Sequence, residues 1–238
     1  MLKGKYNLKE MNDFLEDKSP KEIISYAINL LKVENITTAS SLSIEDQMLT
    51  HLAVSENESS RVFVLDTGRH FQSTYDVMDE TQRKYGFKYE VYFPDTKELE
   101  NFLRNYGPNT FYIDVENRKK CCSIRKINPL KRALENVDAW IVGLRREQGV
   151  TRTNVPIVDF DETHGILKFS PLAKLTEEEV WAYIKENKVP FSELYNKGFR
   201  SIGCEPCTRA VKEGEDIRAG RWWWENPESK ECGLHLKK

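Results

Sequence analysis

The sequence lacks an excess of charge of either sign, a long apolar run, internal repeats and low-complexity linkers. Acidic and basic residues number 38 and 36, so there is no general basic field to attract nucleic acid. No apolar run approaches the roughly 18 residues of a membrane-spanning helix, and the charged residues 1–17 lack the apolar core of a signal peptide. We therefore expect a cytosolic protein that has neither nucleic acid nor a membrane as partner.

Cysteine is also scarce, with five in 238 residues. Structural disulfides are rare in the cytosol, where paired cysteines more often bind metal or carry out redox chemistry. Cys121 and Cys122 are adjacent, Cys204 and Cys207 are separated by two residues, and Cys232 stands alone near the C-terminus. Four thiols plus one suggest a four-thiolate site for a metal or cluster and one free thiol left for chemistry.

The adjacent pair of cysteines bears on which metal group is involved. Neighbouring thiols on a helix diverge by about 100°, since a helix has about 3.6 residues per turn, and two diverging thiolates can reach separate iron atoms of one cluster. Tetrahedral zinc usually takes cysteine hooks with two to four residues between the thiols. The residues alone favour an iron–sulfur cluster, while structural zinc, inert buried thiols and a redox Cys-x-x-Cys pair stay open.

Apolar β-branched runs alternate with helical patterns along most of the chain. This alternation predicts a mainly parallel sheet flanked by helices on both faces. Thr176 and Glu179 have the spacing of a capping box and open the last predicted helix. Strands are predicted at 36–40, 61–65, 88–93, 139–142 and 166–169, with helices from about 44 and over 71–85, 96–106, 129–136 and 176–187.

Three polar motifs follow predicted strands, where ligands of such sheets bind. Ser40-Ser-Leu-Ser-Ile-Glu-Asp46 leads into a helix N-terminus that suits phosphate or sulfate, although Ser43 could simply cap that helix. Leu65-Asp-Thr-Gly68 is either an ordinary turn or a close approach to a ligand. The loop from Gly143 to Arg152 carries three arginines that could bind anions or form a solvated basic loop.

Beyond about residue 213 the regular pattern ends, and the stretch is rich in charge, glycine and tryptophan. We expect an α/β domain over residues 1–215 and a C-terminal tail over 216–238. Arg218 and Arg221 precede three consecutive tryptophans, which could clamp an adenine and its phosphates or dock the tail. A thiol in a polar tail has no packing purpose, so Cys232 is a candidate nucleophile, with His235 nearby.

Five motifs together resemble thioredoxin-dependent adenylyl-sulfate reductases, the cluster-bearing branch of the phosphoadenylyl-sulfate reductase family. The resemblance runs from about Ser40 to His235. It implies an adenine nucleotide α-hydrolase-like fold. The motifs are Cys-Cys-Ser-Ile-Arg-Lys, Gly-Leu-Arg-Arg-Glu-Gln, Gly-Cys-Glu-Pro-Cys-Thr-Arg, Gly-Arg-Trp-Trp-Trp-Glu and Lys-Glu-Cys-Gly-Leu-His.

The resemblance also implies the parts of the site. A [4Fe-4S] cluster would be held by Cys121, Cys122, Cys204 and Cys207, and Cys232 would be the nucleophile. Implied substrate contacts are Ser40, Ser41, Ser43, Leu65, Lys126, Gly143, Arg152, Arg218, Arg221 and His235. Two departures from the family pattern are Ser43-Ile44 in place of Gly-Ala and Gly149 in place of Ser.

The hypothesis is an assimilatory reductase that converts adenosine 5′-phosphosulfate to sulfite and AMP through an S-sulfocysteine at Cys232. Thioredoxin or glutaredoxin would resolve this intermediate. Residues 1–215 would then bind the nucleotide and residues 216–238 would be a catalytic tail, which we expect to close as a lid because Cys232 must meet both the nucleotide and thioredoxin. Alternatives are a reductase that also accepts the 3′-phosphorylated nucleotide, a sulfurtransferase on the same fold, and a non-enzymatic module stapled by zinc. The sequence leaves a homo-oligomer open.

Overall fold

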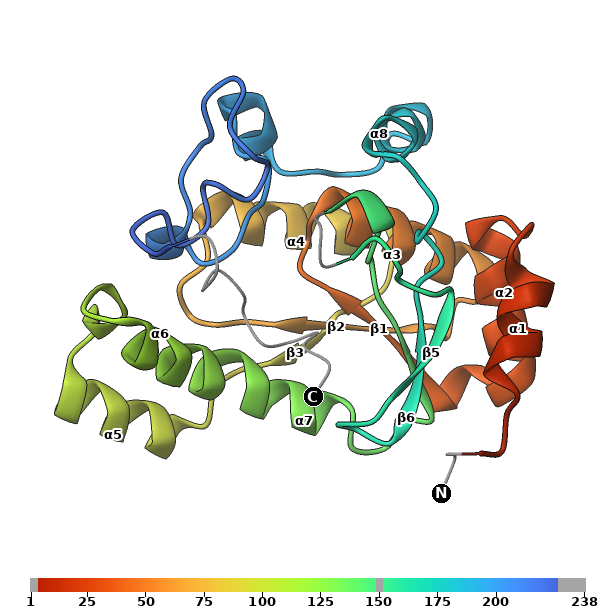
Figure 1. Ribbon diagram of the computed structural model, residues 1–238, viewed down its shortest axis with the longest axis horizontal. Helices are drawn as coiled ribbons and strands as arrows, with labels where there is room; N and C mark the ends of the chain where they lie inside the picture. The colour runs from red at the N-terminus through yellow and green to blue at the C-terminus, as the bar shows by residue number, and fades with distance from the viewer. Residues whose placement is uncertain (1–3, 149–151, 227–238) are drawn as a thin grey trace. The chain divides into compact units, whose positions relative to one another are not determined.

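The computed structural model describes residues 4–148 and 152–226, which form an α/β fold around a mostly parallel sheet (Figure 1). Within these residues the sheet has six strands in the order β3-β2-β1-β4-β6-β5. Strand β1 pairs in parallel with β2 and β4, and β4 pairs in parallel with β6. The strands are β1 (Ile36–Ser40), β2 (Arg61–Leu65), β3 (Glu90–Tyr92), β4 (Ala139–Ile141), β5 (Val158–Asp161) and β6 (Ile166–Phe169).

Helices precede and connect these strands, as the alternating pattern predicts. Helix α3 packs against β1, α2 and α8. The helices are α1 (Leu8–Leu15), α2 (Pro20–Leu31), α3 (Ile44–Glu56), α4 (Gln72–Tyr85), α5 (Thr96–Tyr106), α6 (Val115–Cys122), α7 (Asn128–Ala133) and α8 (Glu177–Glu186). A π-helical turn, Ser123–Ile127, joins α6 to α7.

The predicted elements are confirmed with small shifts at their ends. The capping box is present, because the Thr176 side chain accepts from the Glu179 backbone and the Glu179 side chain accepts from the Thr176 backbone. The sequence analysis missed β5, which pairs antiparallel with β6. It runs Val-Asp-Phe-Asp, four residues with two carboxylates, and so resembles a polar loop more than a buried strand.

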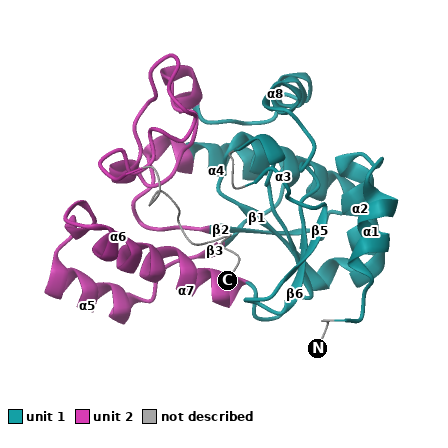
Figure 2. Ribbon diagram, viewed as in Figure 1, with its two compact units in different colours: residues 1–64, 76–90, 134–192 teal, residues 65–75, 91–133, 193–238 magenta. Residues whose placement is uncertain are grey.

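The chain divides into two compact units (Figure 2). Unit 1 comprises residues 1–64, 76–90 and 134–192, and it holds most of the sheet. One of its apolar clusters joins Leu42, Val54, Val62, Val64, Val77 and Tyr89. Unit 2 comprises residues 65–75, 91–133 and 193–238. In residues 4–148 and 152–226 no helix is long and apolar enough to cross a membrane.

Candidate functional site

Four cysteines come together in unit 2, although Cys122 and Cys204 are 82 positions apart in the sequence. Cys121 and Cys122 end helix α6, while Cys204 is the N-cap and Cys207 the last residue of the 3₁₀ turn Glu205–Cys207. Cys122, Cys204 and Cys207 form one buried cluster with Phe111 and Trp222, and Cys121 packs against it. All four are free thiols. The structure therefore collects the four predicted ligands at one place.

A pocket opens at this place, and we call it the cysteine pocket. Its empty space, part of it open to solvent, is about 360 Å³. The described residues that line it include no carboxylate. They comprise the four thiols, the cations Arg69, Arg118, Arg125 and Lys126, and Phe111, Pro206 and Trp222. This lining of sulfur and positive charge suits an anionic group that has a preference for thiolate ligands.

The turn after β2 contributes directly to the cysteine pocket. Thr67 Oγ1 lies 3.3 Å from Cys204 Sγ, and Arg125 Nη1 donates to the Thr67 carbonyl at 2.5 Å. Gly68 has φ +67°, and a Cβ there would press on the Phe93 ring at 3.0 Å. The sequence analysis gave Thr67 no role, because threonine in a strand-to-helix turn is common. Only the fold brings it to a cysteine 137 positions away.

Burial and charge shift the pKa values of these thiols in different directions. Burial raises the pKa of Cys121, and burial together with the neighbouring Cys204 raises the pKa of Cys207 to about 12. Burial also raises the pKa of Cys204, but Lys126, the Thr67 hydroxyl and Arg221 outweigh it, and the net direction is down. Lys126, an implied substrate contact, thus lies close enough to the thiols to favour the charged form of Cys204.

The first part of the predicted tail packs inside unit 2. Trp222 is 1% exposed and belongs to the cysteine cluster. An isolated bridge pairs Thr208 with Arg221, and the Trp222 amide donates to the Cys207 carbonyl at 3.1 Å. Residues 216–226 are thus a packed segment, which corrects the expectation of a lid that begins at about Asp216. The proposed boundary of a tail at 216–238 stays a prediction.

The two arginines predicted in this segment have different surroundings. Arg221 is 8% exposed, its guanidinium stacks on Trp222 at 4.7 Å, and it contacts Ser201 Oγ at 3.4 Å. A Cβ at Gly203 would overlap the Arg221 guanidinium, so this close packing needs glycine. Arg218 is half-buried, and its amide donates to Asp216 Oδ1 at 2.8 Å. Arg221 is therefore held rigidly.

In unit 1, residues 40–46 form what we call the serine loop. Both the amide and the hydroxyl of Ser41 donate to Asp46 Oδ2, at 2.7 and 2.5 Å. Ser40 Oγ accepts from the Leu42 amide at 3.2 Å, and Leu42 has φ +63°. Ser43 occupies the N-cap of α3, yet its side chain makes no capping bond. Serine hydroxyls thus shape this loop around a carboxylate.

Burial raises the pKa of Asp46 to about 6, although the bonds from Ser41 oppose the shift. Gly143, after β4, lies against this carboxylate, because a Cβ at Gly143 would overlap Asp46 Oδ1. Leu65, the last residue of β2, belongs to unit 2, and its carbonyl is 3.1 Å from His70 Nε2.

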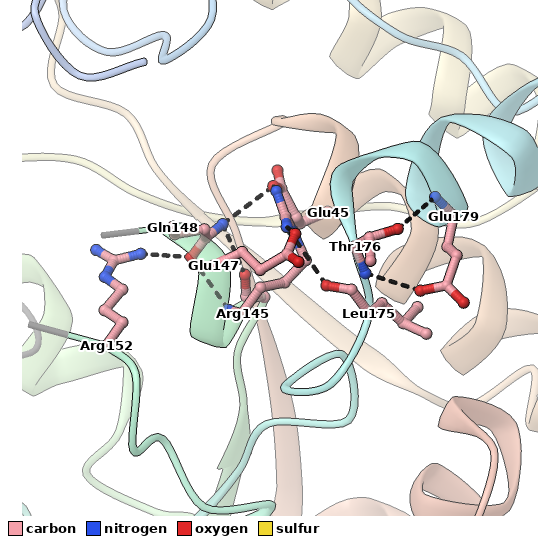
Figure 3. Close-up of polar contacts among 9 residues, drawn as sticks. Glu45, Arg145, Glu147, Gln148, Arg152, Leu175, Thr176 and Glu179 are labelled. Carbon is pink, nitrogen blue, oxygen red and sulfur yellow. Dashed lines mark hydrogen bonds and ion pairs between the residues drawn. The ribbon is translucent and has the colours of Figure 1, made fainter. Parts of the chain in front are cut away.

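The arginines that follow Gly143 are anchored in unit 1 (Figure 3). Arg145 is buried against Glu45 of α3, with Nη2 3.0 Å from Oε1. Gln148 donates to the same Glu45 oxygen at 3.0 Å, and its own oxygen accepts from Arg152 Nη1 at 2.5 Å. Arg145 is therefore neither a solvated residue nor exposed for anion binding, because it is buried in an ion pair with Glu45. Arg146 donates to the Val155 carbonyl at 3.0 Å.

The structure thus brings some predicted residues together within each unit. In unit 1 it brings Ser40, Ser41, Ser43 and Gly143 to the surroundings of Asp46. In unit 2 it brings Lys126 and Arg221 to the four cysteines. Cys232, His235 and Gly149 lie outside the described residues.

A family model described as the phosphoadenosine phosphosulfate reductase domain matches residues 35–210. The chain belongs to this family. Among the curated relatives is the adenosine 5′-phosphosulfate reductase of Allochromatium vinosum, 47% identical over 206 residues that cover 87% of this chain and 80% of the relative. The protein of the same name from Sinorhizobium fredii strain USDA 257 is 41% identical and covers 96% and 90%. Membership therefore holds over most of the sequence.

Solved structures agree with this assignment. Phosphoadenylyl-sulfate reductase from Candida auris, in a phosphate complex, has a TM-score of 0.74 and 26% identity, with 86% of this chain and 96% of that chain covered. An NH₃-dependent NAD synthetase from Campylobacter jejuni has a TM-score of 0.51 at 14% identity, with 82% and 78% covered. The second likeness bears on the fold alone, and it agrees with the expected adenine nucleotide α-hydrolase-like fold.

Proposed function

We propose that this protein is an assimilatory reductase that converts adenosine 5′-phosphosulfate to sulfite and AMP. The observation that carries the proposal is the cysteine pocket, in which four thiols and several cations converge. Relatives that are 47% and 41% identical over most of this chain are named adenosine 5′-phosphosulfate reductases. A cytosolic location, where dithiol proteins keep thiols reduced, is part of the proposal.

The cofactor in this proposal is a [4Fe-4S] cluster held by Cys121, Cys122, Cys204 and Cys207. In the part of the chain that the structure describes, no three histidine, cysteine or acidic side chains are arranged for a single metal ion. A [4Fe-4S] cluster has a different requirement, because each of its four iron atoms binds one thiolate. Four buried or half-buried thiols around one cation-lined pocket fit that requirement. The bound cluster would supply structure and a fixed electrostatic field.

The chemistry in this proposal starts at Cys232. Its thiolate attacks the sulfur of adenosine 5′-phosphosulfate, the S–O bond to the phosphate breaks, and AMP leaves with that electron pair. A thiolate of reduced thioredoxin or glutaredoxin then attacks Cys232 Sγ and releases sulfite. The second thiol of the dithiol resolves the mixed disulfide and regenerates Cys232. The dithiol supplies both electrons, so the cofactor need not exchange any.

The proposed substrate contacts would offset negative charge. In unit 2, Lys126, Arg218 and Arg221 would bind phosphate and sulfate oxygens and stabilise charge on the departing AMP. In unit 1, Arg152 would do the same, and Ser40, Ser41, Ser43 and Gly143 would offer hydroxyls and close backbone approach. Leu65 and His235 complete the proposed set.

One experiment tests this function against its alternatives. The protein is purified anaerobically, its iron, sulfide and zinc are measured, and sulfite release is assayed with reduced thioredoxin and with reduced glutaredoxin. Adenosine 5′-phosphosulfate and its 3′-phosphorylated form are compared as substrates, because this chain is similar to reductases of both names. We expect about four irons per chain, brown protein and sulfite from the first nucleotide. Colourless zinc protein that releases no sulfite would overturn the proposal.

A further inference from the structure

The C-terminal segment is fastened to helix α6 by a buried ion pair between Arg118 and Glu225. Arg118 Nε donates to Glu225 Oε1 and Arg118 Nη2 to Glu225 Oε2, both at 2.9 Å. The two side chains are 1% and 3% exposed. A bidentate contact of this kind, which we call two-pronged, fixes the orientation of the carboxylate relative to the guanidinium as well as the distance between them. Residue 225 therefore has a defined position on the helix that ends in Cys121 and Cys122.

Trp222 strengthens this attachment. Its ring lies within 4.6 Å of the Arg118 guanidinium and 4.7 Å of the Arg221 guanidinium, so two cations contact one buried indole. Trp222 also has φ +42°, an uncommon conformation for a bulky residue. Surrounding contacts must hold such a conformation in place. The Glu225 amide donates to the Trp222 carbonyl at 2.8 Å, which closes a turn between the stack and the ion pair.

Arg118 also contacts the cysteine pocket. It precedes Cys122 by one helical turn, lines the pocket with it, and interacts with the Cys122 thiol. One buried guanidinium thus has two partners, a thiol of the pocket and the carboxylate of Glu225. We call Glu225 the root of the segment that continues to Cys232. The proposed nucleophile Cys232 lies seven residues beyond Glu225 in the sequence. Seven residues span at most about 25 Å, which bounds the distance of Cys232 from this root.

We propose that Arg118 and Glu225 are positioning residues. Their ion pair holds Glu225, the root of the segment that continues to Cys232, beside the cysteine pocket. This inference rests on the proposed function, because it assigns Cys232 the attack on the nucleotide. A fixed root raises the effective concentration of the thiol near its target. Loss of the ion pair would lower this effective concentration and slow the attack, while nucleotide binding is unaffected.

The test uses the anaerobically prepared full chain with Glu225→Gln. The amide keeps the shape of the carboxylate but points a donor group at the guanidinium, so the two-pronged contact is lost. The first measurement is hydrogen exchange on a peptide that spans residues 221–226, where the amides of Trp222 and Glu225 are hydrogen bonded. The second is the single-turnover rate of sulfonate transfer to Cys232, followed by mass, together with the AMP dissociation constant.

Glu215→Gln is the matched control. Arg209 and Glu215 form another two-pronged pair in unit 2, at 2.8 and 3.0 Å, but it is half-exposed and lies earlier in the chain. We expect Glu225→Gln to exchange faster at residues 221–226 and to transfer sulfonate at least about tenfold more slowly, with AMP affinity and iron content unchanged. We expect Glu215→Gln to match wild type in all four measurements, and Glu225→Asp to lie between.

The outcomes separate the anchor from the reaction. Wild-type exchange in Glu225→Gln would overturn the anchor, whatever the enzyme does. Faster exchange with an unchanged rate of sulfonate transfer would overturn the positioning role. If wild type places no sulfonate on Cys232, the proposed chemistry is wrong, and the positioning role in that chemistry falls with it.

Discussion

Arg145 and Glu45 form a buried ion pair that ties the loop after β4 to the N-terminus of α3. Arg145 Nε and Nη2 lie 3.1 and 3.0 Å from Glu45 Oε1, and the side chains are 2% and 10% exposed. Gln148 donates to the same Glu45 oxygen, and the side-chain oxygen of Gln148 accepts from Arg152 (Figure 3). Arg145, a candidate anion ligand in the sequence, thus connects two segments of unit 1 through a buried ion pair.

Arg145→Met should therefore destabilise the protein by about 3–5 kcal/mol, because removal of one partner leaves a buried carboxylate without its cation. Urea unfolding under anaerobic conditions measures this loss. Arg61→Met is the control, since Arg61 pairs with Glu90 in the same unit but both side chains are about one-third exposed. That change should cost no more than about 1 kcal/mol. Equal costs for the two variants would refute the role of the buried ion pair.

The stability of unit 1 should depend on the protonation of Asp46. Burial raises its pKa from 3.8 to about 6, so between these values the folded state binds more protons than the unfolded state. Stability from this group is then present at low pH and falls as pH rises through the window. The loss amounts to about 3 kcal/mol. Asp46→Asn should remove it, so that the variant gains stability relative to wild type from about pH 4 to 7 in urea titrations. Parallel pH profiles for the two proteins would contradict the shift.

Periodicity and caps predicted the sheet well because they are local. Strand Ile36–Ser40 and the box of Thr176 and Glu179 are decided by residues close in sequence. The grouping of the four cysteines was also predictable, since their number and spacing carry chemical meaning. What could not be predicted depends on distant partners. No residue near Arg145 in the sequence indicates that its partner is Glu45, which lies 100 positions away.

The same limit explains why the packing of residues 216–226 was not predicted. Residues 216–226 have the composition of a solvated segment, with charged residues on either side of the indoles and a glycine before them. The structure buries Trp222 by placing Arg118, from another part of unit 2, over its ring. Arg118 of helix α6 both neutralises Glu225 and covers the Trp222 ring. The composition of residues 216–226 gives no sign of these partners, so the burial of this segment could not be predicted from it.

Replacement of any one of Cys121, Cys122, Cys204 or Cys207 by Ser should lower the iron content well below that of wild type. A cube with four iron atoms takes four thiolates, and a hydroxyl is a poor substitute. Iron analysis and absorbance near roughly 400 nm of anaerobic protein measure the loss. Cys232→Ser serves as the control and should keep its iron. Full iron content in all four variants would remove these residues from the proposed cofactor site.

Lys126→Ala should slow turnover while the iron content stays intact. Lys126 lines the cysteine pocket and lowers the pKa of Cys204, yet as a cation it cannot bind iron. Loss of a cation that stabilises developing negative charge lowers kcat/KM by about 10²-fold. Steady-state kinetics at low salt measure the effect. Lys119, an exposed lysine of α6, is the matched control, and its alanine variant should behave as wild type. Unchanged kinetics for Lys126→Ala would count against the proposed role.

Cys232→Ser should abolish sulfite release while the protein keeps its iron, its colour and its affinity for AMP. The reason is chemical, because a serine hydroxyl at neutral pH is a far weaker nucleophile than a thiolate. Wild type incubated with adenosine 5′-phosphosulfate and no reductant should gain one sulfonate on the peptide that contains Cys232, and reduced thioredoxin should remove it. Addition of the sulfonate to a cysteine of the pocket instead, or near-normal turnover in the serine variant, would show that another group makes the attack.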